Sequence, residues 1–481
     1  MTSTAILIFP HQLFPLTHWR KWRRHTFFLI EDPLFFGQRE IRLHFNRLKL
    51  IYHRASMQFF YHQMTAAKYN IHYISLTDNP AQILASYTKK IAYYPADRLL
   101  QERWRDVKYV DTPYFLLSSS HMEQYRIKHG TRQRFVHREF YHFVKQKLNL
   151  LTDVKSQDED NRQPLPPDYI CPTLPIMNNV KEQSYLEDAE QYIRQHFPHA
   201  PGPDQFNPAE FLFPIGRRGA LRALRHFIRD RFAKFGPYED AMSTSSIAIH
   251  HSLLSTPINI GLITPKEVVK EIMSAKVDMQ SKEGFIRQLI GWREYSRMLY
   301  ELAYDAMKQA NCFSHQRRLS SDWYRGTTGI DPLDITIRKA FHHGYLHHIE
   351  RLMIVANLMN LCEICPDDAY RWFMEFSCDS YDWVMVNNVY SMGLWADAGL
   401  TMRKPYVSSP AYVLKMSDFI ADDRWVNIWR GLYYTFIEKN REQIKGTPLI
   451  YNIGYWRRLP EAERSRLEKL ARRQRSKVGR K

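Results

Sequence analysis

The side chains best suited to chemistry lie in one short stretch, residues 342–361. The stretch contains His342, His343, His347 and His348, followed by Arg351. Tyr345–Leu361 lacks Pro and Gly, and its apolar residues recur at three and four positions, so we expect a helix. In that helix His347 and Arg351 share one side, while His348 lies about 100° away. One histidine could therefore face a pocket and donate a proton while the other has a different role.

Two metal-site hypotheses and one structural hypothesis also fit parts of this stretch. His343 and His347 have the i, i+4 spacing of a zinc-binding pair, but there is no HExxH motif and no carboxylate is obviously placed as a third ligand. Cys362-x2-Cys365, with Cys378 further on, is compatible with a metal or iron–sulfur cluster. Cys362 and Cys365 lie in an apolar helical stretch, however, where cysteine is a common small hydrophobic residue. The structural alternative is a set of neutral, hydrogen-bonded histidines, and we expect no metal here.

The composition favours a globular protein with a polyanionic partner. The chain has 481 residues, enough for two or three domains, with 44% hydrophobic and 14% aromatic residues. A net charge of +18 indicates nucleic acid or an anionic membrane surface as the partner. No window of about 18 apolar residues is present, so no transmembrane helix is expected, and the first residues lack the basic start of a signal peptide. Five cysteines do not make a disulfide framework, so we expect a cytoplasmic protein.

The first 150 residues alternate strand-like and helix-like segments. Four short runs predict strands: Ala5–Phe9, Thr26–Ile30, Ile71–Ser75 and Ile91–Tyr94. A helix is predicted over Arg39–Lys68, and it could break near Ala55–Ser56. This order gives βαβ units and a parallel sheet, which binds ligands beyond the carboxyl ends of its strands. Those ends are residues 9–12 (FPHQ) and 31–33 (EDP), and no GxGxxG follows the first strand, so ordinary dinucleotide binding is not expected there.

The chain changes character after a connector. Residues 151–177 contain five prolines and a run of charges. Helical patterns precede and follow it, at Phe135–Leu150, Tyr185–His196, Arg218–Phe235, Pro265–Ser274, Gly284–Gln309 and Asp367–Phe376. We predict an α/β + all-α fold with an α/β domain (1–150), a connector (151–180), an all-α domain (181–456) and a basic tail (457–481). The tail, with eleven Lys/Arg and three Glu, fits a solvated helix end, a frayed segment or a non-specific nucleic-acid arm.

Three further polar clusters lie in the predicted all-α domain. Ser252, Ser255 and Asn259 precede a helix start, where hydroxyls and backbone N–H groups can hold a phosphate. Gln288 and Trp292 share one helix face, which is also compatible with a surface helix carrying a packed tryptophan. Residues 382–388 (DWVMVNN) are interpreted as a loop with two carboxamides, and Asp397 follows.

These pieces occur in an order that resembles the photolyase/cryptochrome flavoproteins. The matching runs are FGPYEDAM (235–242), HSLLSTPINIGLITP (251–265), EGFIRQLIGWREY (283–295), GTTGIDPLDITI (326–337), GYLHHIERLMIVANL (344–358), YRWFMEF (370–376), SYDWVMVNNVYSM (380–392), ADAGL (396–400), KPYVSS (404–409) and MSDF (416–419). Within the family, the chain is most similar to the bacterial branch of iron–sulfur cryptochromes and (6-4) photolyases. The resemblance spans nearly the whole chain. It implies a Rossmann-like antenna domain followed by an all-α, FAD-binding catalytic domain.

The resemblance also implies which residues bind FAD. The matching positions are Ser252, Leu254, Ser255, Asn259, Gln288, Trp292, Arg293, His347, Arg351, Asp382, Asn388 and Asp397. Those from 252 to 259 match the segment that cradles the flavin phosphates, and those from 288 to 293 match a second flavin-binding helix. The remainder match residues around the isoalloxazine ring, with Asn388 toward its reactive edge.

Catalytic and electron-transfer roles are implied in the same way. His348 matches the lesion-side histidine of the (6-4) enzymes, and His347 is expected to support it. Trp372 matches a tryptophan of the flavin photoreduction path, and Trp323 or Tyr324 is the candidate surface relay.

Several positions depart from the family pattern. The cluster cysteines of the iron–sulfur branch are replaced, at Pro332, Ile420 and Asp423, so no iron–sulfur cluster is expected. The first-strand motif at residues 10–12 differs from that of many relatives, which leaves open an antenna chromophore of lumazine or deazaflavin type. The connector lacks a segment that approaches DNA in relatives, and Ser391 and Leu394 replace a usual Gly and Gln. These last departures favour sensing over repair.

The resemblance implies a light-dependent DNA repair flavoprotein of the (6-4) photolyase type, a carbon–carbon lyase acting on UV-damaged DNA. Excited reduced FAD would pass an electron to a pyrimidine photoproduct flipped out of the duplex, and a histidine would supply a proton. The alternatives are a cryptochrome-like blue-light photoreceptor that binds FAD without repair, and repair of cyclobutane dimers or single strands. We expect a monomer with no membrane partner.

Overall fold

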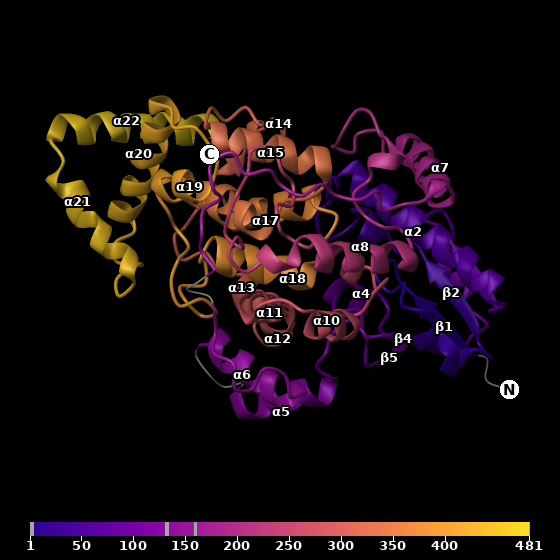
Figure 1. Cartoon of the computed structure of the whole chain (residues 1–481). Coiled ribbons are helices and arrows are strands. Elements are labelled where there is room, and N and C mark those ends of the chain that lie inside the picture. Colours follow the sequence, from indigo (N-terminus) through magenta and orange to yellow (C-terminus); the bar gives the residue numbers. More distant parts are fainter. Residues whose placement is uncertain (1–3, 130–133, 158–160, 481) are drawn as a thin grey trace.

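The computed structural model describes residues 4–129, 134–157 and 161–480. Its amino-terminal part is built on a five-stranded parallel sheet, drawn in indigo and purple in Figure 1. The strands are β1 (Thr4–Ile8), β2 (Thr26–Ile30), β3 (Ile71–Ile74), β4 (Lys89–Tyr93) and β5 (Val107–Val110). Their order is β3-β2-β1-β4-β5, and β1 pairs with β2 from Ala5 opposite Thr26. β1, the central strand, and its neighbour β2 are almost entirely buried, as strands covered on both faces must be.

The predicted parallel sheet is confirmed, with one strand more than the sequence indicated. The four predicted strands lie within one or two residues of their expected ends. The fifth, β5, has the sequence VKYV and is only partly buried, because it forms an edge of the sheet. A short run with a lysine inside it gives little strand signal.

The helix predicted after β2 begins later than expected and is not broken. α2 spans Arg47–Ala66 rather than Arg39–Lys68. It begins where Asn46 caps it, since the side-chain oxygen of Asn46 accepts from the Leu48 N–H at 2.9 Å. Ala55 and Ser56, at the expected break, are fully buried inside the continuous helix. α7 (Val180–His196) packs against α2, so the helix that follows the connector covers the α/β part.

The remaining short elements of the amino-terminal part connect the strands. They are α1 (Leu16–Trp19), η1 (Arg20–Trp22), η2 (Pro33–Phe36), α3 (Pro80–Ile83) and α4 (Arg98–Arg103), followed by α5 (Ser119–His129) and α6 (His137–Leu148).

The crevice between β1 and β4, where the strand order reverses, is closed by protein side chains. His11 Nε2 lies 2.8 Å from Pro95 O, and the His11 ring stacks on Phe35 with 4.7 Å between centroids. Gln12 Nε2 donates to Tyr93 O at 2.9 Å. His11 Nδ1 and Gln12 Oε1 have no partner among the described residues. An antenna chromophore at this strand end therefore stays a prediction.

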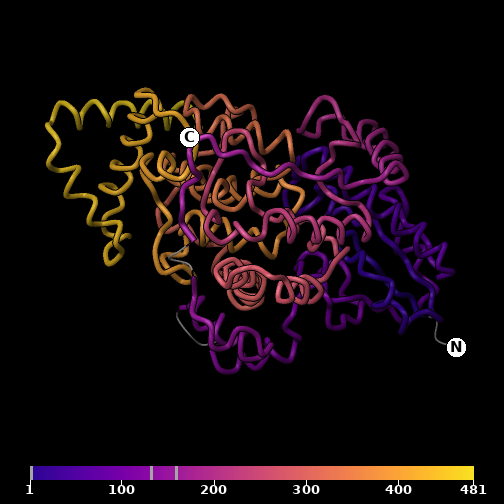
Figure 2. Tube along the Cα trace, viewed as in Figure 1, coloured from indigo at the N-terminus to yellow at the C-terminus, as the bar shows by residue number. Residues whose placement is uncertain are grey.

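The carboxyl-terminal part is helical, as predicted, and lies beside the sheet in Figures 1 and 2. Its first elements are η3 (Pro208–Glu210), α8 (Arg217–Asp230), η4 (Phe232–Lys234), α9 (Ser255–Asn259), α10 (Pro265–Ser274), α11 (Met279–Ile286), η5 (Arg287–Arg293), α12 (Glu294–Leu302), α13 (Tyr304–Lys308), β6 (Arg318–Leu319) and α14 (Asp322–Arg325). The later ones are α15 (Asp331–His343), η6 (Glu350–Ala356), α16 (Asn357–Leu361), α17 (Pro366–Phe376), α18 (Asp382–Val386), η7 (Asn387–Gly393), α19 (Pro410–Met416), α20 (Asp423–Lys439), η8 (Pro448–Asn452), α21 (Ile453–Arg458), α22 (Glu461–Val478) and β7 (Gly479–Arg480).

Three of these segments, η5, η6 and η7, are π-helical and continue α-helices. The helix expected over Tyr345–Leu361 begins instead at residue 348, and most of its first half is the π-helical η6. The loop predicted over residues 382–388 is wrong, because this stretch forms α18 and the start of η7 with Trp383 and Met385 buried. η6 and η7 approach closely at Gly393, where a Cβ would lie 2.9 Å from Ala356 Cβ.

The basic tail is folded over its described residues. α22 packs along α20, and β7 pairs antiparallel with β6 through Arg318–Arg480 and Leu319–Gly479. Trp323 Nε1 also donates to Val478 O at 2.9 Å. The chain end, yellow in Figure 1, therefore returns to the helical part, and the frayed alternative does not hold. Lys481 and residues 158–160 of the predicted connector lie outside the described residues.

Two further findings concern membrane spans and metal ligands. Over the described ranges, no helix has the length and hydropathy needed to cross a membrane. Likewise, no group of three or more His, Cys, Asp or Glu side chains in those ranges is placed to hold a metal ion. Cys362 follows α16 and Cys365 precedes α17, and burial raises the pKa of the Cys362 thiol to about 12.

Asn46 joins the two parts of the chain, so its loss should lower stability. Besides capping α2, its Nδ2 donates to Phe341 O at 2.9 Å from a fully buried position. We expect Asn46→Ala to cost about 1–2 kcal/mol at the cap, with a further loss from the unpaired carbonyl. A lower thermal midpoint in circular dichroism would show this. Asn79→Ala, which removes the cap of the exposed four-residue α3, should change the midpoint much less, and equal effects would contradict the special role of Asn46.

Candidate functional site

The helical part encloses a cavity of about 300 Å³. Apolar and aromatic side chains form most of its wall, among them Leu254, Ile258, Phe285, Leu289, Leu352, Met385 and Met392. Most of the predicted cofactor positions also line it, namely Ser252, Leu254, Ser255, Asn259, Gln288, Trp292, Arg293, Arg351 and Asn388. A concave, mainly apolar site with a few convergent polar groups is typical of cofactor binding.

The π-helical segments decide which side chains reach the cavity. η5 contributes Gln288, Trp292 and Arg293, η6 contributes Arg351, and η7 contributes Asn388. A π-helix has a wider turn than an α-helix and is frequent at functional sites. Residues four and five apart, such as 288, 292 and 293, therefore face the same space.

One ion pair ties three walls of the cavity together. Arg351 Nη2 lies 2.9 Å from Asp379 Oδ1, and Ser255 Oγ donates to Asp379 Oδ2 at 2.7 Å. Asn259 Nδ2 donates to the Asp379 backbone carbonyl at 2.9 Å. Burial alone would raise the pKa of Asp379, but the Arg351 guanidinium and the hydrogen bonds from Ser377 and Ser255 hold it below its ordinary value. The carboxylate is therefore ionised inside the cavity wall.

Asp379 lines the cavity, whereas the family resemblance assigned Asp382 to the cofactor. Asp382 is buried outside the cavity, where it accepts from Tyr300 Oη at 2.6 Å and from Tyr370 Oη, with Arg39 Nη2 at 3.6 Å. The two aspartates are three residues apart, a spacing that would place both on one face only within a continuous helix. Asp379 instead lies in the turn before α18, so the two side chains point into different surroundings.

Asp397 is also outside the cavity. It accepts from the Gly399 N–H at 3.1 Å and from Thr401 Oγ1 at 2.9 Å. It lines a separate surface depression together with Arg134 and Cys312. Its carboxylate therefore stabilises the local turn and does not reach the predicted cofactor.

Arg293 lies among aromatic rings in the cavity wall. Its guanidinium lies 4.7 Å from the ring centroids of Tyr114 and Trp383, and Nη1 donates to Asn259 Oδ1 at 2.5 Å. Burial lowers the pKa of Arg293. Its Nε has no partner among the described residues. A buried cation with an unused donor suits an anionic group of a ligand, so the residues present fit FAD.

The histidine pair is arranged differently from the prediction. His348 is exposed and lines both the cavity and an adjoining groove. His347 is fully buried behind it and does not line the cavity, where His251 is found instead. The rings of His347 and His251 stack at 4.2 Å with an interplanar angle of 9°. The helix expected here begins only at residue 348, so His347 precedes it.

Buried charges surround the hidden histidine. His347 Nε2 lies 3.4 Å from Glu350 Oε2, and Glu350 Oε1 accepts from Lys339 Nζ. Burial, together with the nearby His251, Lys339 and Arg351, lowers the pKa of His347 well below its ordinary value. His347 is therefore neutral near pH 7 and has a supporting position.

The adjoining groove has a volume of about 550 Å³ and shares part of its wall with the cavity. The shared residues include Glu239, Gln288, Trp292, His348 and Met392. Elsewhere the groove is lined by the cations Arg162, Arg287 and Lys404, by the carboxylate Asp240 and by the aromatic Tyr406, Tyr412 and Tyr433. Such a mixture of cations and rings suits a nucleic acid with an unstacked base.

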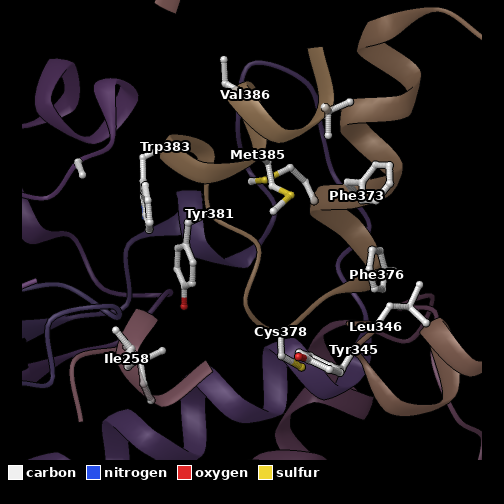
Figure 3. Close-up of a cluster of buried hydrophobic side chains, with 14 of the residues drawn as sticks. Ile258, Tyr345, Leu346, Phe373, Phe376, Cys378, Tyr381, Trp383, Met385 and Val386 are labelled. Carbon is white, nitrogen blue, oxygen red and sulfur yellow. The ribbon is translucent and has the colours of Figure 1, made fainter. Parts of the chain in front are cut away.

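The predicted electron-transfer residues lie on one side of the cavity. Trp372 and Trp323 are both fully buried, and Trp372 Nε1 donates to Trp323 O at 2.8 Å. Trp323 therefore cannot be the surface relay, whereas Tyr324 is half-buried. Phe373, next to Trp372, lines the cavity, and Figure 3 shows it on α17 with Phe376 close by.

Fold and cavity together define a protein with a parallel α/β part and a helical part that contains a mainly apolar cavity with convergent polar groups. The model for the FAD binding domain of DNA photolyase matches residues 278–447, and the model for deoxyribodipyrimidine photo-lyase-related proteins matches residues 6–207. A (6-4) photolyase from Agrobacterium fabrum is 33% identical over 344 residues, which are 67% of this chain and 66% of that relative. The chain thus spans slightly less than two thirds of this curated relative.

Solved structures share the fold over almost the whole length. A bacterial class III photolyase from Agrobacterium tumefaciens matches with a TM-score of 0.56 and 15% identity, covering 99% of this chain and 98% of its own. A Synechocystis cryptochrome matches with a TM-score of 0.58 and 14% identity, covering 99% of both chains. The chain belongs to the photolyase/cryptochrome family.

The two aspartates give a direct test of the cavity. Asp379→Asn removes the charge partner of Arg351, so we expect FAD affinity to fall about tenfold or more, because unpaired buried charges cost several kcal/mol. Asp382→Asn, equally buried but outside the cavity, should lower thermal stability and leave the affinity near wild type. Fluorescence titration of FAD into cofactor-free protein measures both. A larger loss of affinity in Asp382→Asn would restore the original assignment.

Proposed function

We propose that this chain is a light-dependent DNA repair enzyme of the (6-4) photolyase type. The observation that carries the proposal is the position of His348, an imidazole that lines both the cavity and the groove. A proton donor at that junction stands between a cofactor in the cavity and a damaged base in the groove. Chemistry that needs an electron from one side and a proton beside it suits this arrangement.

Arg293, Arg351, Asp379 and Asn388 would hold FAD. When bound and reduced, FAD supplies a light-driven electron to the lesion. Arg293 would bind an anionic group of the cofactor through its unused Nε. The Arg351–Asp379 pair and Asn388 would orient the ring system, and the apolar wall formed by residues such as Leu352 and Met392 would exclude water. Water exclusion matters because it strengthens the electrostatic interactions within the site.

The groove would receive the damaged DNA. Arg162, Arg287 and Lys404 would bind phosphates, while the tyrosines would stack with bases near the flipped-out lesion. The shared wall at Trp292 and Met392 would bring the lesion next to the cofactor. UV-damaged DNA is therefore the proposed partner, and a cytoplasmic monomer the proposed form.

His348 would supply and retake the proton. The enclosing protein, with Arg351 and His251 near it, lowers the pKa of His348 below its ordinary value. Only the imidazolium can donate, so activity should fall as the pH rises through the pKa of His348 in the complex. DNA phosphates in the groove would favour the charged form, because an anion nearby stabilises a cation.

A cryptochrome-like blue-light photoreceptor is the second candidate. The observation that favours it is the pair of carboxylates, Glu239 and Asp240, that face the groove beside its cations and would repel phosphates. A photoreceptor needs the cofactor cavity but no DNA-binding groove. Light-driven loss of a synthetic (6-4) lesion, compared with a cyclobutane dimer in the same oligonucleotide, separates the candidates, and no loss of either lesion favours the photoreceptor.

Replacement of His348 tests its role. We expect His348→Ala to keep FAD and to repair the (6-4) lesion on the order of 100-fold more slowly, because a positioned acid contributes at least that much. The measurement is chromatographic quantification of repaired oligonucleotide under blue light. His342→Ala, at the exposed end of α15, is the control and should repair at the wild-type rate. Unchanged repair by His348→Ala would remove the proposed proton donor.

Lys404 tests the DNA side of the groove. It is exposed and lines the groove, so Lys404→Ala should weaken binding of every duplex and reduce the slope of log affinity against log salt by about 1. Fluorescence anisotropy at several salt concentrations measures the slope. Lys89→Ala, at the exposed first residue of β4 and outside the groove lining, should leave the slope unchanged. Identical slopes in the wild type and both variants would place the DNA elsewhere.

A further inference from the structure

The outer side of α8 carries a row of arginines. Arg218, Arg222, Arg225 and Arg229 are all exposed, at spacings of four, three and four residues. At about 100° per residue these positions fall within roughly 60° of one another, so the four side chains form one stripe. Arg218 and Arg225 form no ion pair with any residue that the structure describes. Arg222 Nη2 donates to Met177 O at 2.6 Å, a neutral partner that leaves its charge uncompensated.

The first turn of α8 meets two other basic segments, η1 and α10. Arg217 Nη2 lies 2.6 Å from Glu267 Oε1 of α10. Burial lowers the pKa of the half-buried His18 of α1, and Glu267 opposes this. Arg217, Lys21 and Lys266 are near enough to His18 to lower its pKa further. The cations of η1, α8 and α10 therefore gather around one imidazole.

These segments hold a large share of the positive charge of the chain. Together they contain eleven Lys/Arg and three Asp/Glu, a net +8 of the total +18. Their ranges are 16–25, 216–230 and 264–274. Two of the three carboxylates are already paired within the segments, Asp230 with Arg229 and Glu267 with Arg217. The excess positive charge therefore faces water and attracts a polyanion.

The exposed side chains of the three segments are polar. Trp19 and Trp22, the large aromatic residues next to the cations of η1, are buried, and none of the exposed large hydrophobic residues lies in these segments. A protein that lies on a membrane surface inserts apolar side chains, and a stable protein–protein interface has an apolar core. A surface of cations without apolar groups suits nucleic-acid phosphates, which guanidinium groups bind bidentately.

The length of the arginine row matches a stretch of phosphate backbone. Eleven residues separate Arg218 from Arg229, which corresponds to about 16 Å along a helix. Each strand of a DNA duplex presents one phosphate per roughly 3.4 Å of its axis, so the row spans about five phosphates of one strand.

This surface is separate from the groove. None of the described residues that line the groove belongs to η1, α8 or α10. Tyr433 of α20 and Leu449 and Asn452 of η8 form part of the groove wall. Figure 1 shows α8 and α10 on the side of the helical part that adjoins the sheet, whereas α20 lies at the opposite end.

We propose that this surface, here called the α8 face, is a second DNA-binding site that holds the phosphate backbone of a duplex without reading its sequence or its damage. The face consists of Arg20, Lys21, Arg218, Arg222, Arg225 and Lys266. The choice of DNA as the polyanion rests on the proposed function, which places only the lesion in the groove. Because contacts of this kind let a protein slide and hop along DNA, the face keeps the protein on the duplex while the groove is empty.

The salt dependence of binding to an undamaged duplex tests the α8 face. The variant Arg20→Ala/Arg218→Ala/Lys266→Ala removes one exposed cation from each of η1, α8 and α10. We expect the slope of log affinity against log salt, measured by fluorescence anisotropy, to fall by about 2–3, because each phosphate contact contributes about 0.9. The rate of lesion repair at saturating DNA should stay at the wild-type value, since none of the three residues lines the groove.

A matched variant separates a site from an effect of net charge. Lys128→Ala/Lys181→Ala/Lys477→Ala removes the same charge from exposed positions on α5, α7 and α22, and it should keep the wild-type slope. Equal slopes in the two triple variants overturn the proposal. Both variants should keep the wild-type thermal midpoint in circular dichroism, because all six side chains are exposed.

Cross-linking locates the contact in a chain that keeps the other cations of the face. A benzophenone side chain introduced as Arg225→p-benzoylphenylalanine should cross-link to an undamaged labelled duplex, whereas Lys181→p-benzoylphenylalanine should not. Absence of the cross-link at position 225 overturns the proposal. Cosedimentation with phosphatidylserine vesicles tests the membrane alternative. Vesicle binding that is lost in the first triple variant, with an unchanged DNA slope, also overturns the proposal.

The outcomes distinguish this inference from the proposed function. A reduced slope in the first triple variant, with no repair of any lesion by the wild type, supports the α8 face and overturns the proposed function alone. A wild-type slope in that variant, with normal repair, overturns the α8 face alone.

Discussion

The buried ion pair between Arg351 and Asp379 is the interaction on which the cavity depends. It connects η6 to the turn before α18, and the hydrogen bonds from Ser255 and Asn259 extend it to α9. Two charges in a mainly apolar wall are tolerable only because each has its partner and additional hydrogen bonds. The same pair orients Arg351 and Ser255, which line the cavity where a cofactor would bind. The ion pair therefore contributes both to the stability of the cavity wall and to its binding groups.

The three π-helical segments are the second constraint. Each contributes cavity residues, and η6 and η7 approach through Gly393 and Ala356. Wider turns sacrifice regular α-helical hydrogen bonds, a cost that persists mostly at functional sites. The cavity, the groove and His348 at their junction are consequences of this local geometry together with the fixed ion pair.

Proton acceptors distinguish the aromatic residues around the cavity. Tyr324 donates to a carboxyl group, while Trp323 and Trp372 donate to backbone carbonyls. The family resemblance offered Trp323 or Tyr324 as the candidate surface relay without distinguishing them. Burial and hydrogen-bond partners separate them, and neither property can be read from residue types alone.

The sequence by itself determined the α/β and all-α parts, the parallel sheet and nine of the residues that line the cavity, because hydrophobic periodicity and ordered family motifs reflect local structure and composition. The family motif assigned Asp382 to the cofactor, whereas Asp379 is the aspartate that lines the cavity, because matching residue types do not show which of two neighbouring carboxylates faces a cavity. The family motif also placed His347 at the cofactor, whereas the structure buries it outside the cavity lining. Tertiary packing alone decided these positions: the ion pair with Arg351 selects Asp379, and the π-helical turns and stacking on His251 bury His347 and leave His348 at the junction.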